Sequence, residues 1–120
     1  MAGLISKEYF DATYFAVPDY AGRLTALSAN GDWVTTADGW VQHQFEVTND
    51  NNWYKTMLTI NGTLINAMTI PNAVPTGIYD YAGQLLPVKA GDDINVQLTY
   101  SAGTIVNFNY LYFYPIRGAL

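Results

Sequence analysis

Cysteine is absent from the sequence, and charged residues are scarce. Without cysteine there is no disulfide framework, no thiolate nucleophile and no zinc–thiolate site. Charged residues make up 12% of the 120-residue chain, which is about half their share in an ordinary soluble domain. Lys and Arg number five against ten Asp and Glu. The chain therefore lacks the positive charge with which proteins bind nucleic acid, and we expect no nucleic-acid partner.

Long apolar runs and a leader pattern are missing as well. No run approaches the roughly 18 apolar residues of a membrane-spanning helix, so we expect no membrane insertion. Residues 1–7 lack the basic residues and following apolar stretch that are typical of a signal peptide. We therefore expect a protein that is made in the cytoplasm without a secretion signal.

Uncharged residues take the place of the missing charge. Hydrophobic residues reach 50% and aromatic residues 15%, and ten of the aromatic residues are tyrosine. This composition excludes intrinsic disorder, which needs low hydrophobicity and high charge. Two explanations fit it: a surface covered by neutral Thr and Asn, or an obligate oligomer, since obligate interfaces are poor in charge. We favour the oligomer.

A β-hairpin is the clearest local element. Asn61-Gly62 separates two β-rich segments, residues 55–60 and 63–68, and this dipeptide suits a type I′ turn because both positions need positive φ. The turn sets the expected register: Ile60 opposite Thr63, and Leu58 opposite Ile65. The full expected set adds the pairs Thr59–Leu64, Met57–Asn66, Thr56–Ala67 and Lys55–Met68. We expect the face that carries Leu58 to be buried.

Alternating apolar and polar residues predict further strands over residues 39–47, 84–88, 94–100 and 105–114. In the first, one face carries Val41, His43, Phe45 and Val47. In the last, Phe108, Tyr110, Tyr112 and Tyr114 share one face, and Asn107, Asn109, Leu111 and Phe113 share the other. Residues 8–17 fit a strand or a helical stripe, with the strand favoured. Eight or nine short strands without a clear helix predict an all-β fold, a jelly-roll-like antiparallel β-sandwich in a single domain over residues 1–120.

Four motifs in the last two thirds of the chain carry a resemblance to a known family. They are Ala-Asp-Gly-Trp-Val at 37–41, Ile-Asn-Gly-Thr at 60–63, Leu-Pro-Val-Lys-Ala-Gly-Asp at 86–92 and Leu-Tyr-Phe-Tyr-Pro-Ile-Arg-Gly at 111–118. Their order resembles the C-terminal receptor-binding heads of phage and prophage tail fibres. It is more distantly similar to the trimeric jelly-roll heads of the tumour-necrosis-factor and complement type. The resemblance implies a homotrimer in a virion appendage that contacts the host surface and other virion or fibre proteins.

A catalytic constellation is not apparent in the sequence. His43 is the single histidine; we expect it to be packed in the core or an interface, bonded to backbone, rather than to act as a base. No serine lies in a Gly-x-Ser-x-Gly elbow, and no two carboxylates form an obvious pair, although distant ones such as Asp50 and Asp80 could converge. We expect no catalytic residue, no metal and no cofactor, and we interpret Asn61-Gly62-Thr63 as a turn rather than a glycosylation site.

Aromatic residues beside Asn- and Asp-rich loops are the candidate ligand-binding residues. Their rings would stack on a pyranose while amide and carboxylate oxygens bond its hydroxyls; these residues are Trp33, Asp50, Asn51, Asn52, Trp53 and Tyr54. The alternatives are that the rings cap the core or contact a neighbouring subunit, and calcium could instead occupy the loop at residues 49–52. The candidate subunit interface, chosen because tyrosine combines apolar area with a hydroxyl, is Phe108, Tyr110, Tyr112 and Tyr114.

The function that the sequence predicts is non-enzymatic attachment of a phage or virion to a host cell-surface ligand, a glycan or a protein. Three copies would multiply a weak site through effective concentration. The alternatives are a purely structural virion decoration or fibre-tip protein, and a free carbohydrate-binding module or lectin. A hydrolase domain is the least favoured.

Overall fold

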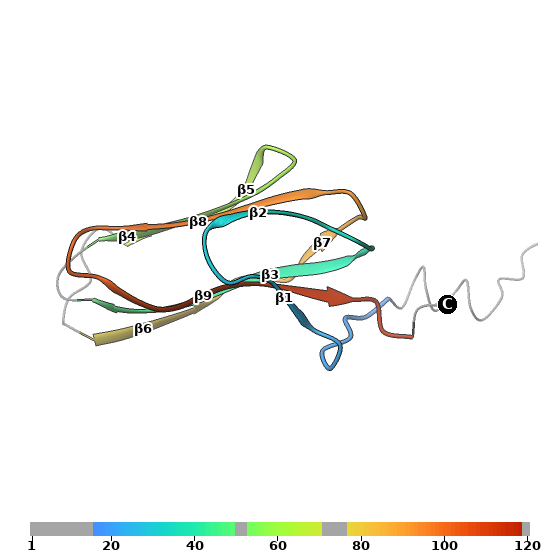
Figure 1. Cartoon of the computed structure of the whole chain (residues 1–120), viewed down its shortest axis with the longest axis horizontal. Coiled ribbons are helices and arrows are strands. Elements are labelled where there is room, and N and C mark those ends of the chain that lie inside the picture. The colour runs from blue at the N-terminus through green and yellow to red at the C-terminus, as the bar shows by residue number, and fades with distance from the viewer. Residues whose placement is uncertain (1–15, 50–52, 71–76, 119–120) are drawn as a thin grey trace, which may run out of the picture.

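The computed structural model describes residues 16–49, 53–70 and 77–118, which form two antiparallel sheets facing each other (Figure 1). One, here called the β9 sheet, has the order β1 (Leu24–Leu27), β9 (Ile105–Pro115), β3 (Gly39–Asn49), β6 (Gly77–Ala82), with β7 (Leu86–Val88) also on β3. The other, the β8 sheet, has the order β2 (Gly31–Val34), β8 (Asp93–Tyr100), β4 (Tyr54–Ile60), β5 (Thr63–Ile70). The described part of the chain contains no helix that could span a membrane.

The strand order is that of a jelly roll. Apart from β7, the sheets read β1-β9-β3-β6 and β2-β8-β4-β5, so the chain crosses between sheets at nearly every connection and returns at the end beside its first strands. This is the two-Greek-key arrangement of a double-sheet jelly roll. The predicted all-β sandwich is therefore confirmed, with nine strands in the described residues. The homotrimer stays a prediction.

The core lies between the inner faces of the two sheets. On β3, the predicted inward face is confirmed, because Val41, Phe45 and Val47 are completely buried. Opposite them, Ile94, Val96 and Leu98 of β8 are also buried. The strict alternation along both strands produces two apolar surfaces that water cannot reach, and their burial is the main stabilising contribution.

The β4–β5 hairpin has the expected turn but not the expected register. Asn61 and Gly62 both have positive φ, 51° and 80°, and Ile60 pairs with Thr63 as predicted. The next pair, Thr59 with Leu64, is also as predicted, but Leu58 then pairs with Asn66 rather than Ile65, and the expected pairs after it are shifted likewise. The cause is a β-bulge at Ile65, which adds one unpaired residue and reverses the orientation of everything after it.

The bulge decides which β5 side chains enter the core. Met68 and Ile70 pack against the buried cluster around Phe45, whereas the Ile65 side chain is 46% exposed. A regular hairpin would have placed Ile65 inside and Met68 and Ile70 outside. The bulge therefore turns Met68 and Ile70 toward the core near the end of the sandwich.

The last strand, β9, runs through the middle of its sheet, between β1 and β3. Residues 111–114 are all buried, which confirms that this segment is covered on both faces. The predicted faces are correct except for Asn107. This residue is the extra one in a bulge between the pairs Glu46–Phe108 and Val47–Val106, so its side chain bonds Glu46 and Thr48 instead of joining Asn109.

Candidate functional site

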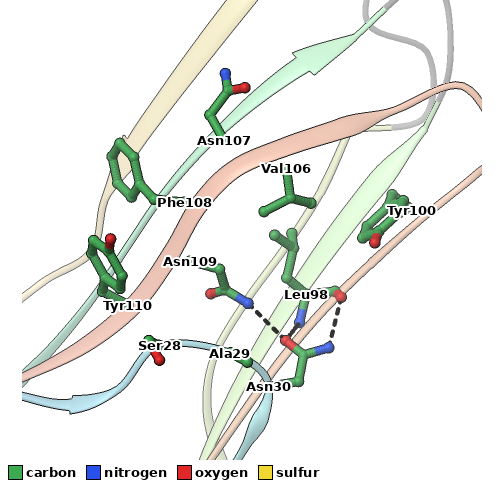
Figure 2. Close-up of a pocket in the computed structure, with 10 residues that line it drawn as sticks. All are labelled: Ser28, Ala29, Asn30, Leu98, Tyr100, Val106, Asn107, Phe108, Asn109 and Tyr110. Atoms are coloured by element: carbon green, nitrogen blue, oxygen red, sulfur yellow. Dashed lines mark hydrogen bonds between the residues drawn. The ribbon is translucent and has the colours of Figure 1, made fainter.

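The flank of the sandwich beside β8 and β9 is open. β1 covers β9 only at residues 111–113, and β2 covers β8 only at residues 93–96. Residues 105–110 of β9 and 97–100 of β8 therefore have no neighbouring strand on this side among the described residues. A groove of about 500 Å³ opens there (Figure 2), a volume within the range of small-ligand sites.

Aromatic and uncharged polar groups line the groove. Figure 2 shows the rings of Phe108 and Tyr110 on one side and that of Tyr100 on the other. The polar lining consists of amides and hydroxyls, and none of the described lining residues carries a charge. The described lining residues are Ser28, Ala29, Asn30, Leu98, Tyr100, Val106, Asn107, Phe108, Asn109 and Tyr110.

Asn30 holds the two sides of the groove together. Its Nδ2 donates to the Leu98 carbonyl at 2.9 Å, and its Oδ1 accepts from the Leu98 N–H at 2.8 Å. The same Oδ1 accepts from Asn109 Nδ2 at 2.9 Å. At Leu98, the Asn30 side chain thus makes the two hydrogen bonds that a neighbouring strand would make to β8. Its bond with Asn109 links β8 to β9. Figure 2 shows these three bonds at the floor of the groove.

His43 continues this network into the core. The ring is buried, and its Nε2 lies 2.6 Å from Asn109 Oδ1. Because Asn109 uses its amide nitrogen on Asn30, its oxygen accepts and His43 Nε2 donates. Among the described residues, His43 Nδ1 has no hydrogen-bond partner. The packed histidine is as expected, but its partner is a side chain rather than the backbone. Burial lowers the pKa of His43, and the bond to Asn109 opposes this in part.

This lowered pKa predicts acid sensitivity of the fold. Below the ordinary pKa of about 6.5, the unfolded chain takes up a proton that folded His43 resists. The free energy of unfolding should be undiminished above that pH. It should then fall as the pH drops from about 6.5 toward the folded pKa, by at most about 1.4 kcal/mol per pH unit for one proton. Urea unfolding between pH 7.5 and 5.5 measures this slope.

The control for the pH prediction is His43→Gln. It should remove the His43 contribution to the slope. Glu46, whose pKa is raised and whose titration therefore acts in the opposite direction, is present in both proteins. Parallel pH profiles for the two proteins would contradict the assignment of the slope to His43.

The four predicted interface residues form a row on the outer face of the β9 sheet. The rings of Phe108 and Tyr110 stack with centroids 5.4 Å apart, and Tyr112 follows Tyr110 at 5.6 Å. The far end of the row is covered by the same chain, since the Arg23 guanidinium lies 3.9 Å over the Tyr112 ring. Tyr114 is likewise buried. Phe108 and Tyr110 are half-buried, and their contact with another subunit stays a prediction.

The predicted ligand-binding residues do not come together at one place. Trp33 is half-buried, with its ring edge-on to Phe113 at 5.3 Å. It pairs with Ile94, six residues along β8 from Tyr100, a separation of about 20 Å. Asp50, Asn51 and Asn52 lie outside the described residues.

Trp53 and Tyr54 lie at the same end of the sandwich as Tyr100 of the groove. Trp53 is 41% exposed, and its carbonyl accepts from the Ser101 N–H at 3.1 Å. Tyr54 pairs directly with Tyr100 across β4 and β8. Its ring, however, is 5% exposed and packs edge-on against Phe45 in the core. Of the two, only Trp53 presents a ring to solvent.

Carboxylates meet at one place that the sequence did not indicate. Glu46 and Asp80 are paired on β3 and β6, and the hydrogen bond with Asp80 is the main cause that raises the pKa of Glu46. The two groups lie outside the groove, on the outer face of the β9 sheet. The described residues contain no group of three or more His, Asp or Glu side chains able to hold a metal.

A second hollow of about 510 Å³ lies where β7 joins β3, and its walls include Trp40, Pro87 and Ile116. The carboxylates at its rim already serve turns. Asp38 accepts from the Ala90 N–H at 2.9 Å, and Asp92 accepts from the Lys89 N–H at 2.8 Å. The groove, whose lining hydroxyls of Ser28, Tyr100 and Tyr110 have no partner within the described part of the chain, is the better candidate for a ligand site.

Comparisons with known proteins return structures only, since no family model and no curated protein match the chain. The CBM36-1 domain of a multidomain xylanase from the hindgut metagenome of Trinervitermes trinervoides is 14% identical, with TM-score 0.42, over 82% of this chain and 83% of that one. GITRL from bushbaby is 18% identical, with TM-score 0.41, over 75% and 74%.

A β-glucosidase from Paenibacillus barengoltzii is 10% identical, with TM-score 0.43, over 76% of this chain. The chain spans only 10% of that enzyme. At these identities and TM-scores the chain is assigned to none of these families.

Proposed function

We propose that the protein is a non-catalytic carbohydrate-binding domain and that the groove between β8 and β9 holds the saccharide. The observation that carries the proposal is the lining itself. Three aromatic side chains, Tyr100, Phe108 and Tyr110, stand beside amide and hydroxyl groups in an open groove of about 500 Å³. Aromatic faces pack against the C–H faces of a pyranose, and the polar groups match its hydroxyls.

Several hydroxyl groups of the groove are available for hydrogen bonds to a ligand. The structure gives no partner to the hydroxyls of Ser28, Tyr100 and Tyr110 among the described residues. The edge of β9 at residues 105–110 adds backbone donors and acceptors, because alternate residues of an unpaired edge direct these groups outward; on the β8 edge Asn30 already occupies the N–H and C=O of Leu98. Asn30 fixes the groove floor before a ligand arrives, which reduces the entropy lost on binding.

Binding without hydrolysis fits the position of the carboxylates. Glycosidases place two carboxyl groups across the scissile bond, about 5–10 Å apart. The described lining of the groove carries no carboxylate; Glu46, paired with Asp80 on the outer face of the β9 sheet, adjoins the groove through its bond from Asn107 and is not part of that lining. We therefore propose a binding module, the second alternative of the sequence analysis. Such a module would also serve in a homotrimer that attaches a virion to a host surface. This wider role stays a prediction.

Truncating the groove tyrosines tests the proposal. Tyr110→Ala and Tyr100→Ala should each weaken saccharide binding at least about tenfold, because each removes an aromatic contact at the centre of the site. Titration calorimetry with a panel of oligosaccharides measures the affinity. The matched control is Tyr20→Ala, an exposed tyrosine that contacts Tyr114 rather than the groove. Equal saccharide affinities of all three variants and the wild type would contradict the assignment of the binding site to this groove.

A further inference from the structure

We infer that the groove selects an uncharged saccharide and discriminates against anionic ones such as uronic acid oligomers. This inference rests on the proposed function and narrows its ligand class. It depends on three features: the lining of the groove, the carboxylates next to it, and the position of the cation on the neighbouring ring.

The lining offers no counter-ion for a carboxylate ligand. The groups that face the groove are amides, hydroxyls, aromatic rings and apolar side chains. These satisfy the hydroxyls of a neutral sugar at little cost. A carboxylate would lose its hydration in the groove and find no Lys or Arg among the described lining residues, which makes its transfer from water unfavourable.

Negative charge adjoins the groove at Asn107. This lining residue donates from Nδ2 to Glu46 Oε1 at 2.9 Å. Asp80 is the cross-strand neighbour of Glu46, and its hydrogen bond with Glu46 is the main cause that raises the pKa of Glu46, with a smaller contribution from the negative charge of Asp80. A ligand carboxylate beside Phe108 would be a third negative group in the same region. The chain as a whole, with net charge −5, adds long-range repulsion.

A bond from Arg23 to a ligand would favour an anionic saccharide, but the Arg23 side chain already contacts an aromatic ring outside the groove. Its guanidinium lies 3.9 Å over the Tyr112 ring, one ring beyond Tyr110 in the aromatic row. It is not among the groove lining. Recruiting it to a ligand in the groove would cost this cation–π contact.

The experiment compares neutral and anionic ligands of equal length. Titration calorimetry at low salt uses hexasaccharides of glucose, xylose, mannose and galactose, and hexasaccharides of galacturonic and glucuronic acid. The wild type should bind at least one neutral hexasaccharide and bind the uronates at least about tenfold more weakly. Salt at 0.5 M should leave the neutral affinity within about twofold and reduce the discrimination.

Variants that add a positive charge test whether the groove itself discriminates against anionic saccharides. Ser28→Lys places a cation on the groove wall and should raise the uronate-to-neutral affinity ratio about tenfold. Ser28→Gln controls for side-chain size, and Thr36→Lys adds the same charge on an exposed residue between β2 and β3. Both controls should leave the ratio within about twofold of wild type. An unchanged ratio in Ser28→Lys would overturn the inference.

The experiment distinguishes failure of the charge preference from failure of the carbohydrate site. If the wild type prefers a uronate and Arg23→Gln abolishes that binding, the inference falls while the groove remains a carbohydrate site. If the wild type binds no hexasaccharide of either class, the proposed function falls and the inference with it. Equal affinity for neutral and anionic ligands overturns the inference alone.

Discussion

Asn30→Ala should lower the free energy of unfolding by about 2–4 kcal/mol. The substitution removes three hydrogen bonds, two with the Leu98 backbone and one with Asn109. It leaves the N–H and C=O of Leu98 and the Asn109 amide without partners in a partly buried position. Each unsatisfied polar group costs about 1–3 kcal/mol, and water entering the groove floor offsets part of the total.

Urea denaturation followed by circular dichroism measures this loss. Asn95→Ala is the matched control, because Asn95 also donates to a side chain, Asp32, but at an exposed site; its effect should stay within about 0.5 kcal/mol. Asn30→Ala should also weaken saccharide binding, since the groove floor loses its fixed geometry. Equal stabilities of the two variants would contradict the role assigned to Asn30.

Phe45→Ala should lower the free energy of unfolding by about 3–5 kcal/mol. Phe45 is completely buried and is the centre of an aromatic cluster. Its ring stacks on Tyr81 at 4.9 Å and meets the Tyr54 ring edge-on at 5.9 Å. Truncation to alanine removes the ring from all of these contacts and leaves a cavity that the two sheets cannot close.

Ile78→Ala is the control for Phe45→Ala. Ile78 belongs to β6 of the same sheet, but its side chain is largely exposed, so its truncation should cost less than about 1 kcal/mol. The two unfolding curves should share a similar m-value, since the same fold is lost. A Phe45→Ala protein with the stability of Ile78→Ala would contradict the assignment of the core.

The strands of this fold were predictable because their signals are local. The alternation from Val41 to Val47 and the Asn61-Gly62 turn each specify structure within a few residues. The bulges at Ile65 and Asn107 were not predictable in the same way. Each bulge changes which side chains face inward, and that choice depends on how well Met68 and Ile70, or Val106, fill the space against the opposite sheet.

The site was less predictable because it forms where strands are missing. Phe108 and Tyr110 were singled out from the sequence, but as interface residues. That they line a groove follows from the shortness of β1 and β2. One available signal was Asn109, an amide on the inward face of an aromatic strand, which requires a buried partner. The partners Asn30 and His43 lie 79 and 66 residues away, so only the topology reveals them.

Backbone amide shifts in an NMR titration with the neutral hexasaccharides show where a saccharide binds, because they locate the ligand without any substitution. We expect the largest shift changes in residues 28–30, 98–100 and 106–110. Changes in β5 and at the hollow beside Trp40 should be small. Shift changes concentrated at that hollow, or none at millimolar saccharide, would contradict the claim that the groove between β8 and β9 binds carbohydrate.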